Sequence, residues 1–268
     1  MQMILDITRT AIALLFLFYA SWSDYKTREV SNKVWALFAP PAFALTFVEL
    51  VLYGSTQLLL YGICFSITAA LGLLLFYSGG FGGADAKALM CLALALPFYP
   101  EKLSLPTAVE NSPITQRFFP ITVFSNSVLF AAFTAVAILF YNLFWRLRTH
   151  QQLFEGDHGK ESIGKRILVM ITAYKVSTDK LKEKWHIYPM EDIERSGENW
   201  KRKLIIVPRD EGRAEIVGRI SGAVENGTIP DRVWATPGLP MLIFILAGLI
   251  TALLFGDIVW TCIRLVLQ

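Results

Sequence analysis

Two aspartates, Asp24 and Asp85, are the residues of this sequence whose type and setting best suit chemistry. Asp24 closes a long apolar stretch, and Asp85 follows a glycine-rich run at residues 78–84. Two carboxyl groups that lie near one another do not easily both ionise, so one of them keeps its proton. Such a pair can supply a base that activates water and an acid that protonates a leaving group. The pattern indicates the chemistry of an aspartic protease.

Other catalytic and metal chemistries find little support in the sequence. The chain has three Cys and three His. The cysteines lie in apolar stretches without C-x-x-C spacing and are expected to be small core hydrophobes. The histidines lie in a polar region without metal-ligand spacing, and there is no G-x-S-x-G or phosphate-binding loop motif. We therefore predict no metal site, no cofactor and no nucleic-acid partner.

The composition of the 268 residues is that of a membrane protein with one polar insert. Hydrophobic residues make up 54% of the chain, charged residues only 18%, and the mean hydropathy is +0.47. An average soluble domain is about 25% charged. Residues 146–236 hold 17 of the 25 Lys and Arg and 14 of the 22 Asp and Glu. The rest of the chain is therefore depleted of charge, as a hydrocarbon environment demands.

A helix that crosses a membrane needs about 20 mostly apolar residues. Six stretches are predicted to cross, of which the fourth is short and begins with charged residues: 4–22, 34–53, 57–77, 84–99, 119–145 and 239–263. Pro40 and Pro41 predict a kink in the second. The first is interpreted as a retained span and not a cleaved signal peptide, because Asp6 and Arg9 cancel and no small-x-small cleavage site follows.

The Lys and Arg residues of short loops predict the orientation of these spans. The loop at residues 23–33 carries three basic residues, and Arg146 and Arg148 follow the fifth span directly. This bias favours an external N-terminus. Asp24 and Asp85 then fall near the same cytoplasmic face, where acids at membrane depth are expensive enough to indicate function. We expect a multi-pass protein of the cell membrane whose active site and soluble domain face the cytoplasm.

The glycines before Asp85 suit the same chemistry. An extended substrate has to approach the backbone beside Asp85 closely, and glycine lacks the Cβ that would obstruct it. A regular helix within the membrane would hide its backbone groups from a peptide. We therefore predict that Gly82, Gly83 and Ala84 bind the substrate.

Each aspartate also has a purely structural explanation. Asp85 precedes a helix-forming stretch, and Asp is favoured as a helix N-cap. Asp24 can be a solvated acid at the membrane surface that pairs with Lys26 or Arg28. Taken singly, these explanations stay open. The joint placement of the two acids on one face, one of them beside a glycine-rich run, favours catalysis.

Residues 146–236 are predicted to fold as a small β-rich or α+β cytoplasmic domain. Residues 166–176 are rich in β-forming side chains, and residues 203–207 and 214–220 flank a turn-like segment, which suggests a hairpin. The predicted organisation is a membrane domain at 1–145, this soluble domain, and a last transmembrane helix at 237–268. The small excess of basic over acidic residues in the insert is typical of an ordinary solvated surface. Alternatively, it marks a surface that meets anionic lipid headgroups or helps to dock a substrate.

The two aspartate segments resemble motifs of intramembrane aspartyl proteases. Gly82-Gly83-Ala84-Asp85 resembles their G-x-G-D signature, with Ala84 in place of the second Gly, and Lys87 fits the D-x-K continuation of prepilin peptidases. Residues 24–32 resemble the other aspartate motif, D-x-x-x-R-x-I-P-N, with Val and Ser in place of Ile and Pro. The insert before the last span resembles the archaeal members, the preflagellin peptidases. The resemblance covers nearly the whole chain.

This resemblance implies six spanning helices and an enzyme that removes the short basic leader from preflagellins (archaellins) and related type IV pilin-like precursors. Carried over by position, Asp24 and Asp85 are the catalytic pair, and the partners are these precursors and the lipid bilayer. The cysteine-pair zinc loop of many bacterial prepilin peptidases is absent, so N-methylation of the mature end is not expected.

The motif residues near the aspartates are expected to have mainly structural roles. Lys87 is expected to mark the interface or contact lipid phosphate, Arg28 to orient the loop and Asn32 to cap the second span. Glu49 and Asp257 are expected to be dispensable for chemistry.

Three other functions are alternatives to leader cleavage. Signal-peptide-peptidase or presenilin-like enzymes would carry a Y-D motif, but Ser23 precedes Asp24. A proton-coupled transporter would show inverted repeats and acids near the midplane, and neither is visible. A non-catalytic subunit of a pilus or secretion apparatus is the third alternative. Loss of precursor processing in aspartate variants would separate a protease from the transporter and the subunit.

Overall fold

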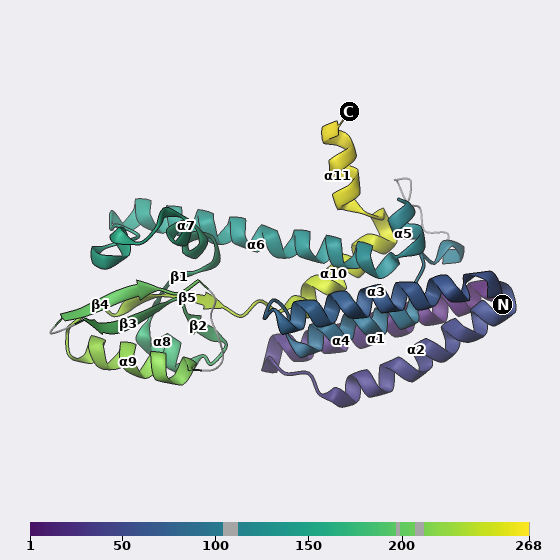
Figure 1. The fold of residues 1–268 in the computed structure, drawn as a ribbon, viewed down its shortest axis with the longest axis horizontal. Helices are drawn as coiled ribbons and strands as arrows, with labels where there is room; N and C mark the ends of the chain where they lie inside the picture. The colour runs from purple at the N-terminus through teal and green to yellow at the C-terminus, as the bar shows by residue number, and fades with distance from the viewer. Residues whose placement is uncertain (104–111, 197–198, 207–211, 268) are drawn as a thin grey trace. The chain divides into compact units, whose positions relative to one another are not determined.

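The structure is a computed structural model that describes residues 1–103, 112–196, 199–206 and 212–267 (Figure 1). The chain forms two compact units. The first comprises Met1–Ala131 and Pro240–Gln268, and the second comprises Ala132–Leu239. The sequence-based boundaries near residues 145 and 236 stay a prediction.

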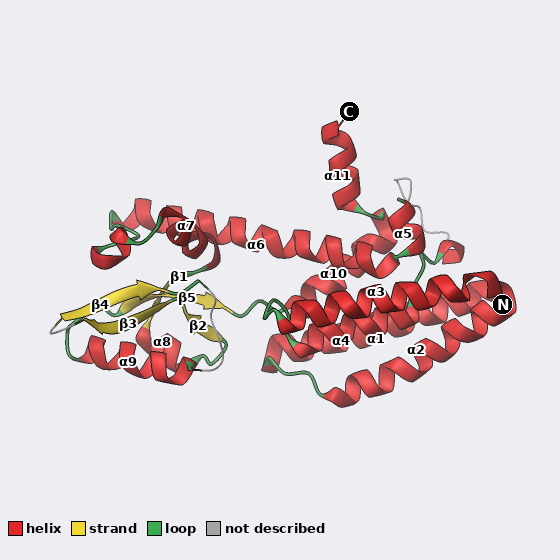
Figure 2. Ribbon diagram, in the orientation of Figure 1, coloured by secondary structure: helices red, strands yellow, loops and turns green. Residues whose placement is uncertain are grey.

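The first unit is helical (Figure 2). It contains α1 (Gln2–Thr27), α2 (Asn32–Tyr53), η1 (Ser55–Gln57), α3 (Leu58–Tyr77), α4 (Gly83–Ala95), η2 (Glu101–Leu103), α5 (Pro113–Arg117), α10 (Met241–Phe255) and α11 (Ile258–Leu267). The long helix α6 (Phe119–Thr149) begins in this unit and ends in the second. α2 continues through Pro40 and Pro41 without an interruption of the helix.

Four helical stretches of the described chain are long and apolar enough to cross a membrane: Gln2–Thr27, Asn32–Tyr53, Ser55–Tyr77 and Phe119–Thr149. They coincide with the first, second, third and fifth predicted spans. α10 and α11 are bent by 61° and add a fifth span if they count as one. α4 has 13 residues, about 20 Å of helix against a hydrocarbon core of about 30 Å. The six-span count therefore stays a prediction.

The break between α10 and α11 divides the predicted last span. Gly256 ends α10 with a φ of 69°, a conformation that favours glycine. Asp257 Oδ1 then accepts a hydrogen bond from the Trp260 N–H at 2.9 Å and caps the start of α11. A turn residue and a cap thus interrupt a predicted span whose other residues are mostly apolar, and its overall composition did not reveal the break.

The core of the first unit is built around α4, whose Leu89, Leu92 and Ala93 are fully buried. α1 packs on α2 and α10, and α4 packs on α2 and α3. Gly248 permits a close approach of α10 to α6, because a Cβ there would lie 2.6 Å from the Val123 carbonyl oxygen. A short buried helix is thereby held on several sides by longer ones.

The second unit combines helices with two small antiparallel sheets. Its elements after α6 are η3 (Gly156–Lys160), α7 (Ile163–Thr172), β1 (Tyr174–Ser177), α8 (Thr178–Glu183), β2 (Ile187–Pro189), β3 (Glu191–Ser196), β4 (Asn199–Leu204), α9 (Arg213–Glu225) and β5 (Arg232–Pro237). One sheet has the order β1-β5-β2, and the other pairs β3 with β4. The expectation of a small sheet-containing region is confirmed, in its α+β form.

Two of the predicted strands in this unit are wrong. Residues 166–176 form mostly α7, because Ser162 Oγ accepts the Lys165 N–H at 3.4 Å and caps a helix. Residues 214–220 lie in α9, which buries Val217 and Ile220 on one side. Residues 208–211 of the predicted hairpin turn lie outside the described residues. The hairpin instead joins β3 and β4, with Asp192 opposite Lys203.

Candidate active site

Asp24 lies in the last turn of α1 and is partly exposed. Arg28 follows the helix in the left-handed conformation, with φ 57°, and its N–H donates to the Asp24 carbonyl oxygen at 2.9 Å. The hydroxyls of Ser23 and Thr27 donate to the Glu29 carbonyl oxygen at 2.8 and 3.0 Å. These contacts end the helix sharply and hold the loop that follows Asp24.

The neighbouring cations differ in their relation to Asp24. The Arg28 guanidinium acts electrostatically on the Asp24 carboxyl. The Lys26 ammonium instead lies 4.4 Å from the centre of the Trp22 ring. Of the two partners expected for Asp24, Arg28 is the one that the structure supports.

Asp85 lies in the first turn of α4 with 8% of its surface exposed. Its Oδ2 accepts the Gly82 N–H at 2.9 Å. A carboxylate in this place satisfies a free N–H at the helix start and is stabilised by the helix dipole. The predicted capping role is therefore present, although Gly82 is the N-cap residue and Asp85 reaches back to it.

The two aspartates lie at the same end of the helical unit. Arg9, near the start of α1, donates to the Ala95 carbonyl oxygen at the end of α4 at 3.4 Å, and Asp24 in the last turn of α1 acts electrostatically on Asp85 in the first turn of α4, so α1 and α4 run in opposite directions. The end of α1 therefore lies beside the beginning of α4. The charge of Asp24 acts on the Asp85 carboxyl. Two carboxyl groups 61 residues apart in the sequence thus share one electrostatic environment.

The residues before Asp85 differ in how open they are. Gly82 is exposed, whereas Gly83 and Ala84 are partly buried. A Cβ on Gly82 would lie 3.2 Å from Asp85 Oδ2, and one on Gly83 would lie 3.5 Å from the Phe76 ring. Gly82 is therefore the position of the three at which a side chain would crowd the carboxyl.

We predict that Gly82→Ala slows substrate cleavage about tenfold, because the new Cβ presses on a carboxyl whose placement decides the reaction. The assay is the rate of leader removal from a co-reconstituted precursor in lipid. Gly62→Ala in α3 is a matched control, because a Cβ there meets no atom within 4 Å. Equal rates for the wild type and Gly82→Ala would show that this close approach has no role.

Lys87 joins the start of α4 to the start of α2. Its Nζ donates to Asn32 Oδ1 at 2.6 Å. The N-cap of α2 is Ser31, whose Oγ accepts the Lys33 N–H at 3.3 Å. The expectation that Asn32 caps this helix is therefore wrong, and Lys87 has a protein partner where lipid phosphate was expected. The D-x-K spacing in the sequence singled out Lys87, but it did not indicate that Asn32 is its partner.

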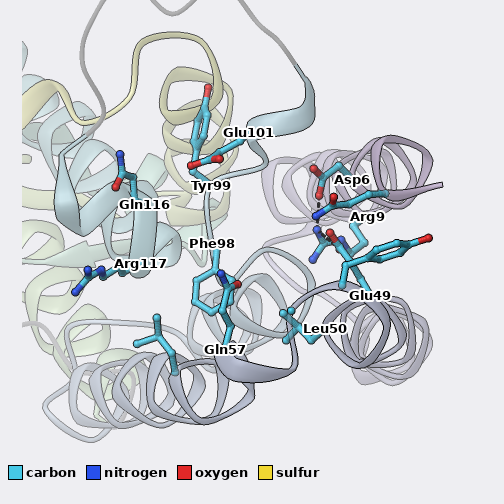
Figure 3. Close-up of a pocket in the computed structure, with 14 residues that line it drawn as sticks. Asp6, Arg9, Glu49, Leu50, Gln57, Phe98, Tyr99, Glu101, Gln116 and Arg117 are labelled. Atoms are coloured by element: carbon cyan, nitrogen blue, oxygen red, sulfur yellow. Dashed lines mark hydrogen bonds and ion pairs between the residues drawn. The ribbon is translucent and has the colours of Figure 1, made fainter.

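A second group of charges lies at the other end of α1. Arg9 forms ion pairs with Asp6 and, at 2.5 Å, with Glu49 (Figure 3). All three side chains are nine-tenths or more buried, and they line a cavity of about 440 Å³. Arg9 and Asp24 are 15 positions apart in one helix, about 22 Å along its axis. This group is therefore separate from the aspartate pair. Arg9 also pairs with a distant acid in addition to neighbouring Asp6.

The second unit has a buried polar group of its own around Glu191. Its carboxylate pairs with Arg202 Nη2 at 2.6 Å, accepts the Trp234 N–H at 3.1 Å and faces His158 Nε2 at 3.6 Å. Burial raises the pKa of Glu191. Burial, followed by the charges of Arg202 and Lys175, lowers the pKa of His158 to about 4. His158 is therefore neutral near pH 7 and belongs to the interior of this unit.

Within the described ranges, no group of three or more His, Cys, Asp or Glu side chains is arranged to hold a metal ion.

Comparison with known proteins gives family matches over most of the chain. Residues 11–140 match the model of the Type IV leader peptidase family, and residues 165–258 match that of Archaeal Peptidase A24 C-terminus Type II. The chain is 26% identical to a preflagellin peptidase of Methanococcus maripaludis over 254 residues, which covers 92% of this chain and 94% of that protein. A preflagellin peptidase of Methanococcus voltae is also 26% identical over 253 residues, with the same coverage. A prepilin peptidase of Methanothermobacter thermautotrophicus is 30% identical over 136 residues, 47% of this chain and 34% of that protein.

The long apolar helices and the sheet-containing second unit define a multi-pass membrane protein with a small α+β part. The chain belongs to the type IV leader peptidase family, and it is a peptidase. The resemblance indicated by the two aspartate segments is thereby confirmed at the level of the family.

Proposed function

We propose that this peptidase removes the short basic leader from preflagellins (archaellins) and related type IV pilin-like precursors, with Asp24 and Asp85 as its catalytic pair. The observation that carries the proposal is the placement of these two acids at the same end of the helical unit, where the charge of Asp24 acts on the buried Asp85. Relatives named preflagellin peptidase match over 92% of the chain and support the substrate class. Family membership favours this function over a transporter or a non-catalytic subunit.

The reaction is the hydrolysis of one peptide bond. One aspartate takes a proton from water as the water oxygen attacks the scissile carbonyl carbon, while the other, protonated, donates a hydrogen bond to the carbonyl oxygen. The C–N bond then breaks, and the leaving amine nitrogen receives a proton from a carboxyl group. Asp85 is held by the Gly82 N–H at Oδ2. Its second oxygen carries no hydrogen bond from the described residues and is available for the water or the carbonyl.

The substrate would lie in extended form against Gly82, Gly83 and Ala84. Gly82 is the exposed member of the three. An extended peptide offers backbone groups that a helical one keeps internal, so the segment to be cut has to leave the helical conformation. The glycine-rich approach to α4 provides room for this beside Asp85.

The site would face the cytoplasm, as would the soluble part. Lys26, Arg28 and Lys33 lie at or beside the loop between α1 and α2, and Arg146 and Arg148 lie in the last turn of α6. Basic residues that flank spans favour the cytoplasmic side. A basic leader that remains in the cytoplasm would then meet the aspartates where its precursor enters the membrane.

Mass spectrometry of a substrate's new N-terminus tests this function. The full-length chain is reconstituted in liposomes with a preflagellin or a type IV prepilin, and each product is sequenced from its N-terminus. We expect one cut that releases the basic leader and leaves the apolar segment intact. Cuts within the apolar segment would instead indicate an enzyme that cleaves inside spans. If folded enzyme cuts neither the preflagellin nor the prepilin, the proposed substrate class is contradicted.

A further inference from the structure

Helix α7 has an apolar side that the protein leaves uncovered. Ile163 is 67% exposed, Ile167 48% and Leu168 41%. At 3.6 residues per turn these three side chains lie on one broad face. Val169, on the other side of the helix, is fully buried against the sheet-containing core. A helix of this kind needs a second apolar environment for its outer face.

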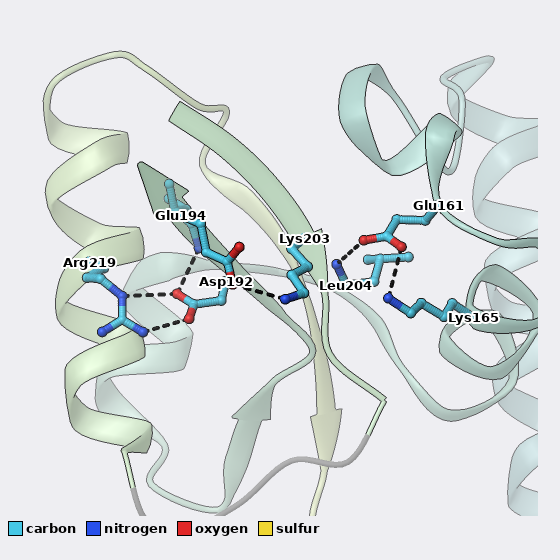
Figure 4. A network of polar contacts seen from close by, with 8 residues as sticks. Glu161, Lys165, Asp192, Glu194, Lys203, Leu204 and Arg219 are labelled. Carbon is cyan, nitrogen blue, oxygen red and sulfur yellow. Dashed lines mark hydrogen bonds and ion pairs between the residues drawn. The ribbon is translucent and has the colours of Figure 1, made fainter. Parts of the chain in front are cut away.

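Polar contacts determine which side of α7 faces outward. Glu161, just before the helix, accepts the Leu204 N–H of β4 at 3.3 Å and pairs with Lys165 Nζ at 3.0 Å (Figure 4). The Asn142 amide of α6 donates to the carbonyl oxygens of Met170 and Ala173 at 2.8 and 2.7 Å. Both ends of α7 are thus tied down, and the helix cannot turn its apolar face inward without the loss of these bonds.

The contact with α6 also gives the depth of α7 in the membrane. α6 is a candidate membrane span. Tyr141 and Trp145 flank Asn142, and Arg146 and Arg148 follow in the last turn. Aromatic residues followed by basic ones mark the boundary between hydrocarbon and headgroups. Because Asn142 binds the C-terminal end of α7, that end is expected at the level of this boundary.

The outer surface of α6 is apolar up to the same level. Phe140 is 65% exposed, Phe144 63% and Leu147 72%, at spacings of four and three residues. This stripe faces lipid wherever α6 crosses the bilayer. This stripe lies on the side of α6 away from Asn142 and α7. α6 and α7 therefore each present an apolar face to their surroundings at about the same level along α6.

We propose that α7 is an interfacial helix, whose Ile163, Ile167 and Leu168 face enters the headgroup region of the bilayer and docks the second unit on the membrane surface. The occupant of this apolar face is lipid, and anionic lipid suits it best. Arg146 and Arg148 have no ion pair with any described residue and can meet lipid phosphate. Amphipathic helices that combine an apolar face with neighbouring cations bind anionic membrane surfaces in this way.

Spin labels on α7 test the proposal in the full-length protein. Cys262 is exposed and is replaced by serine, while Cys64 and Cys91 are buried and remain. Single cysteines are then introduced as Ile163→Cys and Ile167→Cys, with Glu183→Cys, an exposed position at the end of α8, as the matched control. Each labelled protein is placed in liposomes that contain anionic lipid, and its accessibility to oxygen and to a water-soluble nickel complex is measured.

We expect the ratio of oxygen accessibility to nickel-complex accessibility to be several-fold higher for labels at 163 and 167 than for the label at 183. The reason is that oxygen concentrates in the bilayer and the nickel complex in water. The double substitution Ile163→Asp with Ile167→Asp should make a label at Leu168→Cys as water-exposed as the control. Labels at 163 and 167 that behave like the control in wild-type background would overturn the proposal. So would immobilised, water-exposed labels with dipolar broadening between molecules, since they would place a second copy of the chain on this face.

Discussion

Replacement of Asp85 by asparagine is expected to abolish leader removal while the protein stays folded and inserted. Asparagine has nearly the same shape, and its amide oxygen can still accept the Gly82 N–H that Asp85 Oδ2 accepts at 2.9 Å. The start of α4 should therefore be preserved. Asparagine cannot exchange a proton with water, however, and general acid–base catalysis contributes about 10²–10⁴-fold to a rate. We expect Asp24→Asn to have a loss of the same size.

The assay is the rate of leader removal in liposomes, with insertion and folding checked on the same preparations. The double variant should lose no more than either single one, because groups that act as a unit are not additive. Asp257→Asn is the matched control, since Asp257 caps α11 and an amide oxygen can do the same. Near-normal cleavage by either inserted single variant would refute the two-aspartate mechanism.

Replacement of Arg9 by methionine is expected to destabilise the first unit by about 3–5 kcal/mol, the usual cost of removing one partner from a buried ion pair. Arg9 lies between Asp6 and Glu49, and its guanidinium also donates to Thr46 Oγ1 and the Ala95 carbonyl oxygen, both at 3.4 Å. Methionine fills a similar volume but leaves two buried carboxyl groups without a cation. The effect should appear as a lower unfolding temperature in lipid or detergent.

Two further variants separate charge from packing at this position. Arg9→Lys should cost less than Arg9→Met, because lysine keeps the charge but lacks the planar guanidinium. Arg9→Met combined with Asp6→Asn and Glu49→Gln should recover much of the loss, since no buried charge remains unpaired. Lys184→Met, at an exposed position, should leave the unfolding temperature unchanged. If the Arg9→Met protein has the same unfolding temperature as the wild type, the three charges do not stabilise the unit.

The pairing of Glu49 with Arg9 affects the choice of controls for the catalytic test. The sequence presents Glu49 as an acid near the end of an apolar stretch, comparable with Asp257. In the structure Glu49 is 7% exposed and ion-paired. A loss of activity on its replacement would therefore report stability as well as chemistry. Asp257 remains suitable because its role is a local helix cap.

Much of the membrane part could be predicted from the sequence, because its signals are local. A run of about 20 apolar residues suffices to indicate a helix that can cross a bilayer, and α1, α2, α3 and α6 follow such runs. The bend after Phe255 could not be predicted in this way. Its cause is a single glycine with positive φ followed by a capping aspartate, and the mean hydropathy of the stretch does not report a turn or a cap.

The insert shows the limit of judging β-propensity by composition. Residues 166–176 are rich in Ile and Val, yet most of them form a helix. Propensity depends on the surface against which a segment packs. In α7 the bonds from Asn142 and the burial of Val169 fix a helix. The sequence already contains the helical spacing of Val217 and Ile220 that α9 uses. The strand predicted for residues 214–220 ignored this spacing in favour of a hairpin.

The sequence by itself determined that this is a multi-pass membrane protein with a polar insert, and it singled out Asp24 and Asp85, because apolar runs, charge depletion and short motifs are properties of neighbouring residues. Only the tertiary structure decided which distant residues meet. It brought the charge of Asp24 to Asp85, joined Lys87 to Asn32 and Arg9 to Glu49, and left one side of α7 uncovered. These pairings depend on how helices pack in three dimensions, and helix packing follows from the combined shapes of many side chains far apart along the chain.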